Sequence, residues 1–528
     1  MSNFQYRTEG IRKEKYFDYF VETEIEREII NDFKSDSHVV LEGSRGSGKS
    51  FIMKIAESEL SKDFSDEKVL PIYITFVSSS LLHSTDPNQF FHWMIAKILK
   101  ETLKTFDKKG FTISKYAHSL IKGSEENQLE RLINLFENSY KSPNNDIDST
   151  NLPEINDIME VIETVCDENN VHRVVYFFDE AAHVFRPEHQ RQFFTLFRDF
   201  KSPYISCNAA VYPGVTHYGN SFEMTHDALH RILERNITSN SFLSDMKSMV
   251  LKQGGESWKK KIENQMENFN TLAYCSGGNP RIFLKTLDNI DSFTSSKVSD
   301  YIRNFYRSEI WVEHSQLGEK YNGLKKIIDW GRSFLEDNVI PATFQKNEKS
   351  IDRKTIFFWV SKDAPEIIKE ALRLLSYTGI IRKIDSGVKA TKSKIGSRYE
   401  IKYGCVLAQY SNPTTVSKDI IPNLKLEFVS EYGQNNALYN TLSNENILDL
   451  TDKEFLVTLN EQLSKKISVL DLTPWQKEKL KSINIKTVQN LLDISEKELI
   501  DNLHYVGEVK ARVMKNSAIS ELLETISG

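Results

Sequence analysis

Cysteine is scarce in this sequence of 528 residues, and its four copies lie far apart at Cys166, Cys207, Cys275 and Cys405. No two of them have the short spacing of a zinc site or a CxxC redox motif, so the sequence offers no disulfide or metal framework. We expect four buried thiols of the kind found in a reducing cytoplasm.

Long apolar runs are missing as well. The first ten residues, MSNFQYRTEG, lack the apolar core of a secretory signal. No stretch approaches the roughly 20 apolar residues that a membrane-spanning helix needs. We therefore expect a cytoplasmic protein whose partners do not include a membrane.

The sequence also lacks any overall excess of positive charge, because its net charge is -6. A nucleic-acid surface, if the chain has one, must therefore be local. Hydrophobic residues make up 39% and charged residues 27% of the chain, which is typical of globular rather than disordered proteins. A chain of this length exceeds one hydrophobic core, so we expect roughly two to four domains.

A glycine-rich loop, LEGSRGSGKS, occupies residues 41–50. It fits the pattern GxxxxGK[ST], in which backbone amides surround phosphate oxygens, the lysine reaches the β and γ phosphates and the hydroxyl binds Mg²⁺. A buried strand at 38–43 and an amphipathic helix at 51–61 are predicted around it, and the helix dipole favours an anion. The alternative is a flexible turn rich in Gly and Ser. We expect ATP to contact Gly43, Ser44, Arg45, Gly46, Ser47, Gly48, Lys49, Ser50 and Phe51, with Ser50 also a metal ligand.

A second apolar run, RVVYFFDEAAHVF at 173–185, contains the acids Asp179 and Glu180 directly after its apolar residues. Beside a phosphate-binding loop, Asp179 would hold the Mg²⁺ shell and Glu180 would polarise the attacking water. The alternative is a buried strand with a solvated acidic end. The adjacent acids favour hydrolysis of the nucleotide over binding alone.

Two further segments carry polar candidates. A third strand is predicted at 202–214, after a helix at 188–200, and its Asn208 could orient the water or touch the γ-phosphate. A buried Asn bonded to the backbone is the competing interpretation. In the segment YCSGGNPRIFLKTL, a Gly-Gly turn precedes Pro280 at a helix start, with Arg281 in the first turn. A helix cap with a solvent-facing Arg is the alternative there.

The GxxxxGKS, hhhhDE and GGNPR segments together resemble the AAA+ P-loop ATPases, in particular the origin-recognition and helicase-loader-like group, with the STAND signalling ATPases close by. The resemblance covers roughly residues 20–295. It implies an α/β fold with a parallel sheet and a helical lid, bound ATP and Mg²⁺, and assembly into oligomers. It also implies that Arg281 returns from the lid to the γ-phosphate. The catalytic set that it implies comprises Lys49, Asp179, Glu180, Asn208 and Arg281.

The chain departs from a compact ATPase core in two respects. About 130 residues separate Lys49 from Asp179, which predicts an insertion at about 80–165 after a second strand at 72–76. The arginine that a neighbouring subunit would supply is not marked by a motif. Its candidates are Arg231, Arg235 and Arg198.

A local excess of basic residues follows the predicted lid. Between residues 321 and 403 there are 17 Lys or Arg against 10 Asp or Glu. A helix followed by two strands with a lysine-rich tip resembles a winged helix, whose wing could contact DNA phosphates through Lys389, Lys392, Lys394 and Arg398. A solvated hairpin edge kept soluble by lysine is the alternative.

The C-terminal segment from 467 onward resembles helix-hairpin-helix domains, particularly the C-terminal domain of the bacterial RNA polymerase α subunit. In its second hairpin Gly507 would let backbone amides approach a phosphate, with Lys510 nearby. Asn484 and Tyr505, however, stand where the first glycine of such hairpins is usual. The segment also has 8 Lys or Arg against 9 Asp or Glu, so docking of a protein and binding of DNA stay equally open.

The predicted organisation is thus an ATPase core at 1–240, a helical lid at 241–300, a winged-helix-like domain at 301–410, a spacer at 411–466 and a small all-α helix-hairpin-helix domain at 467–528. Two functions fit it. One is an ATP-driven switch or motor acting on DNA or a DNA-bound complex, as in replication, transposition or anti-phage defence. The other is a STAND-like signalling ATPase whose C-terminal modules bind an effector protein.

Overall fold

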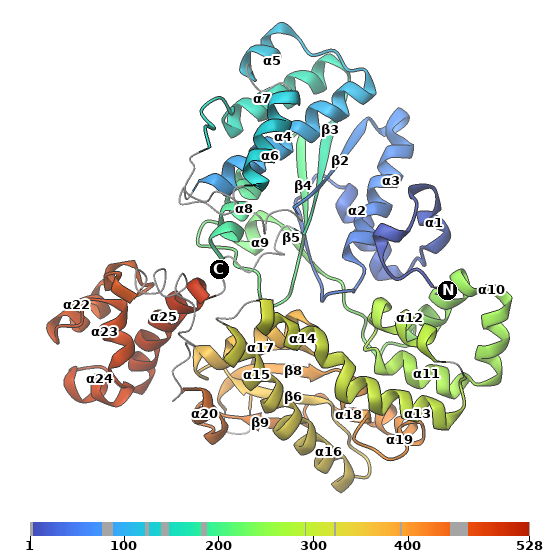
Figure 1. The fold of residues 1–528 in the computed structure, drawn as a ribbon, viewed down its shortest axis with the longest axis vertical. Coiled ribbons are helices and arrows are strands. Elements are labelled where there is room, and N and C mark those ends of the chain that lie inside the picture. The colour runs from blue at the N-terminus through green and yellow to red at the C-terminus, as the bar shows by residue number, and fades with distance from the viewer. Residues whose placement is uncertain are drawn as a thin grey trace. The chain divides into compact units, whose positions relative to one another are not determined.

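The computed structural model describes residues 4–76, 88–121, 126–138, 147–180, 187–290, 292–320, 324–390, 393–443 and 463–526 (Figure 1). The chain divides into two compact units. Unit 1 consists of residues 1–235, 241–260 and 279–288, and unit 2 consists of 236–240, 261–278 and 289–528.

Unit 1 is built on a five-stranded parallel sheet in the order β2-β3-β4-β1-β5. The strands are β1 (Val39–Glu42), β2 (Val69–Thr75), β3 (Arg173–Asp179), β4 (Ile205–Val211) and β5 (Leu229–Ile232). Strand β4 separates the strand that precedes the glycine-rich loop from the strand that ends in Asp179. The predicted α/β class with a parallel P-loop sheet is therefore confirmed.

Both faces of this sheet are covered by helices (Figure 1). Successive side chains of a strand point to opposite faces, so a strand buried on both sides reads as one apolar run. In β3, Tyr176 and Phe178 pack in the core cluster that also contains α4, α7 and α8, whereas Val175 and Phe177 pack in the cluster with α2 and α3. This explains why β3 is visible in the sequence as a continuous apolar stretch.

The helices of unit 1 follow the chain between these strands. They are α1 (Tyr16–Tyr19), α2 (Glu24–Lys34), α3 (Lys49–Glu67), α4 (Gln89–Lys109), α5 (Lys115–Leu120), α6 (Glu126–Glu137), α7 (Ile155–Glu168), α8 (Pro187–Asp199), α9 (Met224–Asp227), most of α10 (Phe242–Asn264) and α12 (Pro280–Asn289), with short 3₁₀ turns at Thr8–Gly10 and Lys13–Lys15. The interval predicted as an insertion contains α4 to α6 and most of α7.

Unit 2 contains a second, four-stranded sheet in the order β7-β8-β6-β9. Its strands are β6 (Phe357–Ser361), β7 (Ile381–Lys389), β8 (Ile395–Ile401) and β9 (Ser430–Tyr432). Helix α17 (Glu366–Tyr377) precedes the antiparallel β7–β8 hairpin, and β8 also pairs antiparallel with β6. The helix and hairpin expected from the sequence are therefore present, and the winged-helix assignment itself stays a prediction.

The other helices of unit 2 lie before and after this sheet in the sequence. They are α11 (Met266–Cys275), α13 (Ser295–Asn304), α14 (Ile310–Lys320), α15 (Lys325–Ser333), α16 (Ile340–Lys349), α18 (Tyr403–Leu407), α19 (Pro413–Ile420) and α20 (Asn440–Ser443), with π-helical turns at Phe305–Glu309 and Phe334–Val339 and 3₁₀ turns at Ile421–Asn423 and Ala437–Tyr439.

Four C-terminal helices surround a separate hydrophobic cluster within unit 2. They are α22 (Pro474–Ser482), α23 (Val488–Asp493), α24 (Glu496–Asn502) and α25 (Glu508–Ile526), preceded by a 3₁₀ turn at Ile467–Val469. Asn484 and Tyr505 adopt left-handed φ angles of 65° and 68°. The two positions where a glycine is usual thus have the backbone conformation that favours glycine.

All four cysteines are free and buried. Among the described residues no cluster of three or more His, Cys, Asp or Glu is arranged to hold a metal ion. Nor does any described helix combine the length and the apolar character that crossing a membrane requires.

Candidate functional site

The glycine-rich loop joins β1 to α3 at the carboxyl edge of the parallel sheet, which is where ligands bind in open α/β sheets. Gly46 and Gly48 have φ angles of 83° and 107°, which L side chains rarely adopt. A Cβ atom on Gly43 would lie 2.6 Å from Ser47 Oγ and 3.1 Å from the carbonyl oxygen of Leu233. The loop therefore requires glycine at these positions to keep its curvature.

Lys49 is buried inside this loop. Its Nζ donates to the carbonyl oxygens of Gly43 at 2.5 Å and Ser44 at 3.2 Å, and lies 4.0 Å from the ring centre of Tyr212. Burial lowers the pKa of Lys49 to about 8. An ammonium group held this way is positioned for phosphate oxygens that enter the loop.

The carboxylate of Asp179 connects three elements of the site. Its Oδ1 accepts hydrogen bonds from Ser50 Oγ at 3.1 Å and from the backbone amide of Glu180 at 3.0 Å. Its Oδ2 accepts one from the Tyr73 hydroxyl at 2.5 Å. Hydroxyl and carboxylate oxygens are ligands that Mg²⁺ prefers, so Ser50 and Asp179 fit a magnesium site.

Tyr73 was not identified from the sequence. It lies on β2, two residues before Thr75, which pairs with Asp179 in the sheet register. Burial, followed by the charge of Asp179, raises the pKa of the Tyr73 hydroxyl well above its usual value, so the phenol stays protonated and donates. The only signal in the sequence was a polar hydroxyl within the apolar strand IYITF, which cannot identify its partner.

Glu180 follows directly after β3 with a φ angle of 56°. Burial, followed by the neighbouring Asp179 carboxylate, raises its pKa. A carboxylate with a raised pKa is a better proton acceptor for a water molecule than an ordinary surface acid. The position and environment of Glu180 are thus suited to a general base.

Helix α12 approaches the glycine-rich loop through its first residues. Asn279 Nδ2 donates to the carbonyl oxygen of Arg45 at 2.9 Å, while its Oδ1 accepts from the backbone amide of Ile282 at 3.1 Å. Asn279 therefore caps α12 and ties it to the loop, a role that the sequence did not reveal. A Cβ atom on Gly46 would lie 2.9 Å from Cβ of Arg281, so Arg281 lies directly against the loop.

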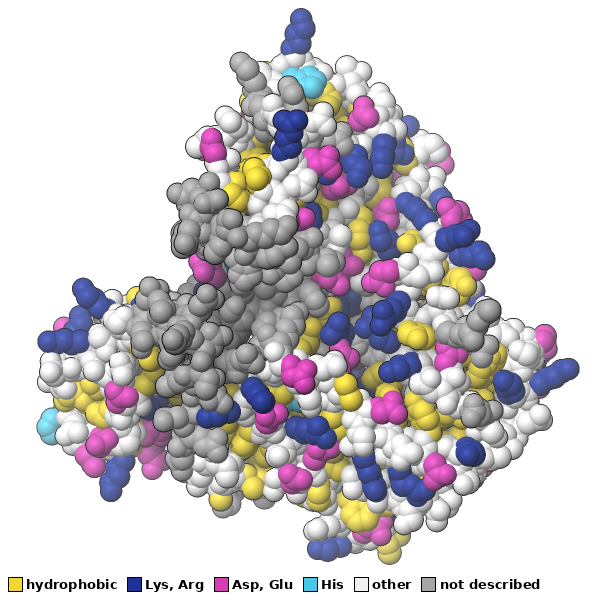
Figure 2. Space-filling view, viewed as in Figure 1, with side chains coloured by type: hydrophobic (Ala, Val, Ile, Leu, Met, Phe, Trp, Pro, Cys, Tyr) yellow, Lys and Arg dark blue, Asp and Glu magenta, His cyan; other side chains and the backbone are white. Residues whose placement is uncertain are grey.

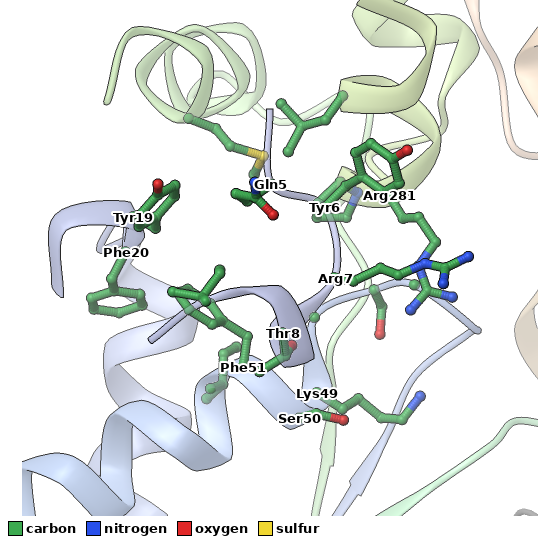
Figure 3. A pocket seen from close by; sticks show the side chains of 18 of the residues that line it. Gln5, Tyr6, Arg7, Thr8, Tyr19, Phe20, Lys49, Ser50, Phe51 and Arg281 are labelled. Carbon is green, nitrogen blue, oxygen red and sulfur yellow. The ribbon is translucent and has the colours of Figure 1, made fainter. Parts of the chain in front are cut away.

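Lys49, Glu180 and Arg281 line one cavity of about 340 Å³ in unit 1, together with Arg45–Ser50 of the loop. In Figure 3 the rings of Tyr19, Phe20 and Phe51 lie on one side of the cavity. The charged ends of Lys49 and Arg281 lie on the other side. A nucleotide has an aromatic base and an anionic phosphate chain, and the cavity offers a side suited to each.

Comparison with protein families gives a match over residues 2–218, to the family described as ORC-CDC6-like. Residues 2–218 are therefore similar to this family. The match contains the glycine-rich loop and the Asp179-Glu180 pair, and ends before α10 and α12. Comparison with curated proteins finds no match.

The chain is also similar to several solved structures. One is the Walker-type ATPase PABY2304 of Pyrococcus abyssi, with 13% identity over 78% of this chain and 99% of that chain and a TM-score of 0.37. Another is the Aeropyrum pernix ORC1 protein in complex with DNA, with 12% identity over 77% of this chain and 100% of that chain and a TM-score of 0.33. A third is a RuvB protein of Thermotoga maritima, with 12% identity over 72% of this chain and 94% of that chain and a TM-score of 0.31.

Asn208 does not line this cavity of unit 1. It pairs with Val39, the first residue of β1, and its Nδ2 donates to the carbonyl oxygen of Phe33 at 3.0 Å. The side chain is fully buried. The structure therefore corresponds to the alternative of a buried Asn bonded to the backbone, because three further residues of β4 separate it from the carboxyl edge. Tyr212, just after β4, is the residue that lines the cavity there.

The three candidates for an arginine finger are each engaged within the chain. Arg231 pairs with Asp32 at 2.6 Å, and Arg198 pairs with Asp199 at 2.7 Å. Arg235 pairs with Glu26, donates to the carbonyl oxygen of Ser47 at 3.3 Å and lines the cavity. Arg235 thus lines a cavity formed by its own chain.

The DNA-binding candidates of the hairpin differ in how they are used. Arg398 is half-buried and pairs with Asp385 at 3.0 Å, and Lys389 and Lys394 are exposed near the tip. Lys392 lies outside the described residues. Arg398 thus forms an ion pair within the hairpin, and of the four candidates Lys389 and Lys394 are exposed to solvent.

At the C-terminal helices, the carbonyl oxygen of Gly507 accepts the first bond of α25, from Ala511 at 3.0 Å. A Cβ atom on Gly507 would meet no described atom within 4 Å, so this glycine faces open space beside the start of α25. Lys510 Nζ donates to the carbonyl oxygen of Tyr505 at 3.0 Å and lies 4.6 Å from the ring centre of Trp475.

Proposed function

We propose that this protein binds ATP with Mg²⁺ and hydrolyses it to ADP and phosphate. The observation that carries the proposal is the convergence of Lys49, Ser50, Asp179 and Glu180, from segments about 130 residues apart, at one edge of the sheet. In this mechanism Lys49 and the amides of the loop bind the β and γ phosphates. Mg²⁺, when bound at Ser50 and Asp179, supplies charge neutralisation of the phosphates.

Glu180 accepts the proton of the attacking water in this mechanism. Arg281, whose Nε is buried against the loop without a hydrogen-bond partner among the described residues, contacts the γ-phosphate. Asn279 holds the start of α12 on the loop so that Arg281 reaches the phosphates. Asn208 has no part in the chemistry.

Titration of the purified protein with ATP by calorimetry tests the binding step. Lys49→Ala should abolish measurable binding because it removes the only ammonium group buried in the loop among the described residues. Lys13→Ala is the matched control, since Lys13 forms an exposed ion pair with Glu57 outside this loop. Unchanged ATP affinity in Lys49→Ala would contradict the proposal.

We further propose that ATP turnover acts on DNA or on a DNA-bound complex. Support comes from the exposed Lys389 and Lys394 at the hairpin tip and from the open space that Gly507 faces beside the start of α25, with Lys510 nearby. Lysines in these positions neutralise phosphates without reading bases, so affinity should fall steeply with salt. Polarisation titrations with duplex DNA, with and without ATP, compare wild type with Lys389→Glu/Lys394→Glu. If wild type does not bind duplex DNA at low salt, or if the variant binds DNA as tightly as wild type does, the hairpin does not contact DNA.

A second candidate is a signalling ATPase whose C-terminal helices bind a protein. The specific observation is a group of exposed apolar side chains at this end of unit 2, namely Trp475, Tyr505, Val509 and Val513, of which Tyr505 is 86% exposed. Exposed aromatic residues are enriched at protein interfaces. On the face shown in Figure 2, Lys and Arg are interspersed with Asp and Glu, without one large basic patch among the described residues.

Two substitutions separate the two candidates. Tyr505→Ala/Val509→Asp should prevent assembly of this chain with itself or an effector, measured by sedimentation with and without ATP, and should leave DNA affinity unchanged. Lys389→Glu/Lys394→Glu should have the reverse effect. Loss of both properties in both variants would mean that neither surface has a separate role.

A further inference from the structure

The first described residues form a segment that is fastened across the nucleotide cavity. The backbone amide of Gln5 donates to Gln253 Oε1 at 2.9 Å, and Gln253 Nε2 donates back to the carbonyl oxygen of Gln5 at 3.4 Å. The ring of Phe4, only 2% exposed, packs on Trp258 with 4.8 Å between centroids. The start of the segment is therefore held to α10, and the 3₁₀ turn Thr8–Gly10 follows.

Arg7 lies two residues after this anchor and lines the cavity. In Figure 3 its guanidinium group points to the side of the cavity where Arg281 and Lys49 end, away from the rings of Tyr19 and Phe20. Among the described residues, the side chains of Arg7 and Arg281 form no ion pair, whereas Arg235 in the same cavity is paired with Glu26. Two guanidinium groups, one from the N-terminal segment and one from α12, thus lie on the same side of one cavity, and neither is paired with a carboxylate among the described residues.

Such an arrangement is electrostatically unfavourable unless an anion lies between the two groups. Guanidinium binds phosphate with two parallel hydrogen bonds, which makes arginine suited to a polyphosphate chain. The nearest acid on the same segment is Glu9, which also lines the cavity. The pKa of Glu180 is raised first by burial, then by the charge of Asp179 and, to a smaller degree, by the charge of Glu9. The charge of Glu9 therefore acts on Glu180.

We propose that Arg7 binds the β and γ phosphates of ATP from the N-terminal segment, beside Arg281. This inference rests on the proposed ATP binding and adds a second arginine, supplied by the same chain, to the phosphate site. The N-terminal segment, which is already held to α10, then adds a cationic contact to the phosphate chain.

Calorimetric titration with Mg-ATP and with magnesium tripolyphosphate, which has no base, tests the inference without requiring turnover. Arg7→Gln should weaken both ligands by about tenfold or more, as expected for the loss of a charge-assisted contact to phosphate. Arg7→Lys should recover part of the loss because it restores the charge but not the two parallel bonds. Arg12→Ala is the matched control, since Arg12 is exposed on the same segment and does not line the cavity.

Two results would overturn the inference. One is unchanged affinity for both ligands in Arg7→Gln. The other is a loss confined to ATP, because an arginine that binds the base or ribose would leave tripolyphosphate unaffected. If Lys49→Ala also binds ATP like wild type, the proposed function itself fails, whereas loss in Lys49→Ala with no change in Arg7→Gln rejects only the role of Arg7. Gln253→Ala releases the anchor with Arg7 intact, and should lower ATP affinity less than Arg7→Gln does.

Discussion

The nucleotide site of unit 1 and the β7–β8 hairpin of unit 2 are both rich in charged residues, but they use these charges differently. At the nucleotide site, acids and cations from the glycine-rich loop, β3, α12 and the N-terminal segment meet in one cavity. In the hairpin, Arg382 pairs with Glu400, Arg398 pairs with Asp385, and Lys402 is buried with its Nζ on the carbonyl oxygen of Ser276.

The comparison shows that a local excess of basic residues is a weak guide to a binding surface. Three of the cations in and beside the hairpin stabilise unit 2 instead. Of the described candidates in the hairpin, only Lys389 and Lys394 are exposed. The glycine-rich loop was a stronger guide because its pattern specifies backbone geometry as well as charge.

The largest expected effect concerns Glu180. Glu180→Gln removes the proton acceptor and keeps the size of the side chain, so we expect the rate of ATP hydrolysis to fall by about 100-fold or more. ATP affinity should change by less than about threefold, because Lys49 and the loop amides are intact. Phosphate release measured beside calorimetric binding checks both values. A rate that falls less than about fivefold would show that the site does not use Glu180 as its base.

Acid should weaken both units through one buried imidazole in each. Burial lowers the pKa of His38 in unit 1 and of His314 in unit 2 to about 4. Both imidazoles are neutral in the folded and unfolded protein well above pH 6.5, so their contribution is fully present there. Between pH 6.5 and about 4 only the unfolded chain takes up the proton, and each histidine lowers the free energy of unfolding by up to about 3 kcal/mol.

Denaturant unfolding at about pH 7.5, 6.0 and 5.0 measures this loss. His314→Gln should be less stable than wild type at the highest pH but lose less stability on acidification, since glutamine does not titrate. Parallel pH dependences in the two proteins would exclude His314 as a source of acid sensitivity.

The contrast within the hairpin predicts a difference in stability. Arg382→Ala leaves the buried Glu400 without its ion pair, and we expect a loss of about 2 kcal/mol in the free energy of unfolding. Lys389→Ala, at an exposed position of the same strand, should change it by less than about 0.5 kcal/mol. Thermal or denaturant unfolding compares the two variants. Equal losses in the free energy of unfolding would show that paired and exposed cations of the hairpin do not differ in their contribution to stability.

The smallest expected effect tests Tyr73. Tyr73→Phe removes one hydrogen bond to Asp179, so the carboxylate is oriented less firmly, and we expect the Mg²⁺ concentration for half-maximal hydrolysis to rise by about fivefold. Binding of ATP without Mg²⁺ should not change. Tyr204→Phe is the matched control, because Tyr204 donates to Asp167 at 2.6 Å outside the cavity. A similar rise in the control would mean a general effect on the fold.

Much of unit 1 could be predicted because its signals are local. The glycine-rich loop requires a strand before it and a helix after it, and β3 is buried on both faces, so each appears in the sequence as an uninterrupted pattern. The length between Lys49 and Asp179 predicted an insertion, and α4 to α7 lie in this interval, while the insertion itself stays a prediction. Its helix α7 was not identified individually, although it has its own capping box at Glu154.

The rest of the site depends on which segments meet, and this is not written in local patterns. Asn279 was part of a recognised motif, yet its bond to Arg45 joins residues 234 positions apart in the chain. Tyr73 meets Asp179 across two strands, and Arg7 precedes every recognised motif. Asn208 lies on the strand that the sequence predicted, but not at the end of that strand where the cavity is. Three further residues of β4 follow it, so its side chain lies in the core.

The left-handed backbone at Glu180 has a consequence for the stability of unit 1. A side chain with φ of 56° costs about 1 kcal/mol or more relative to glycine, and that cost is present whether or not a ligand is bound. Replacement by glycine should therefore make unit 1 more resistant to heat while removing the acid that activates water. The proposed role of Glu180 as the general base gives a reason for an acid at a position whose backbone favours glycine.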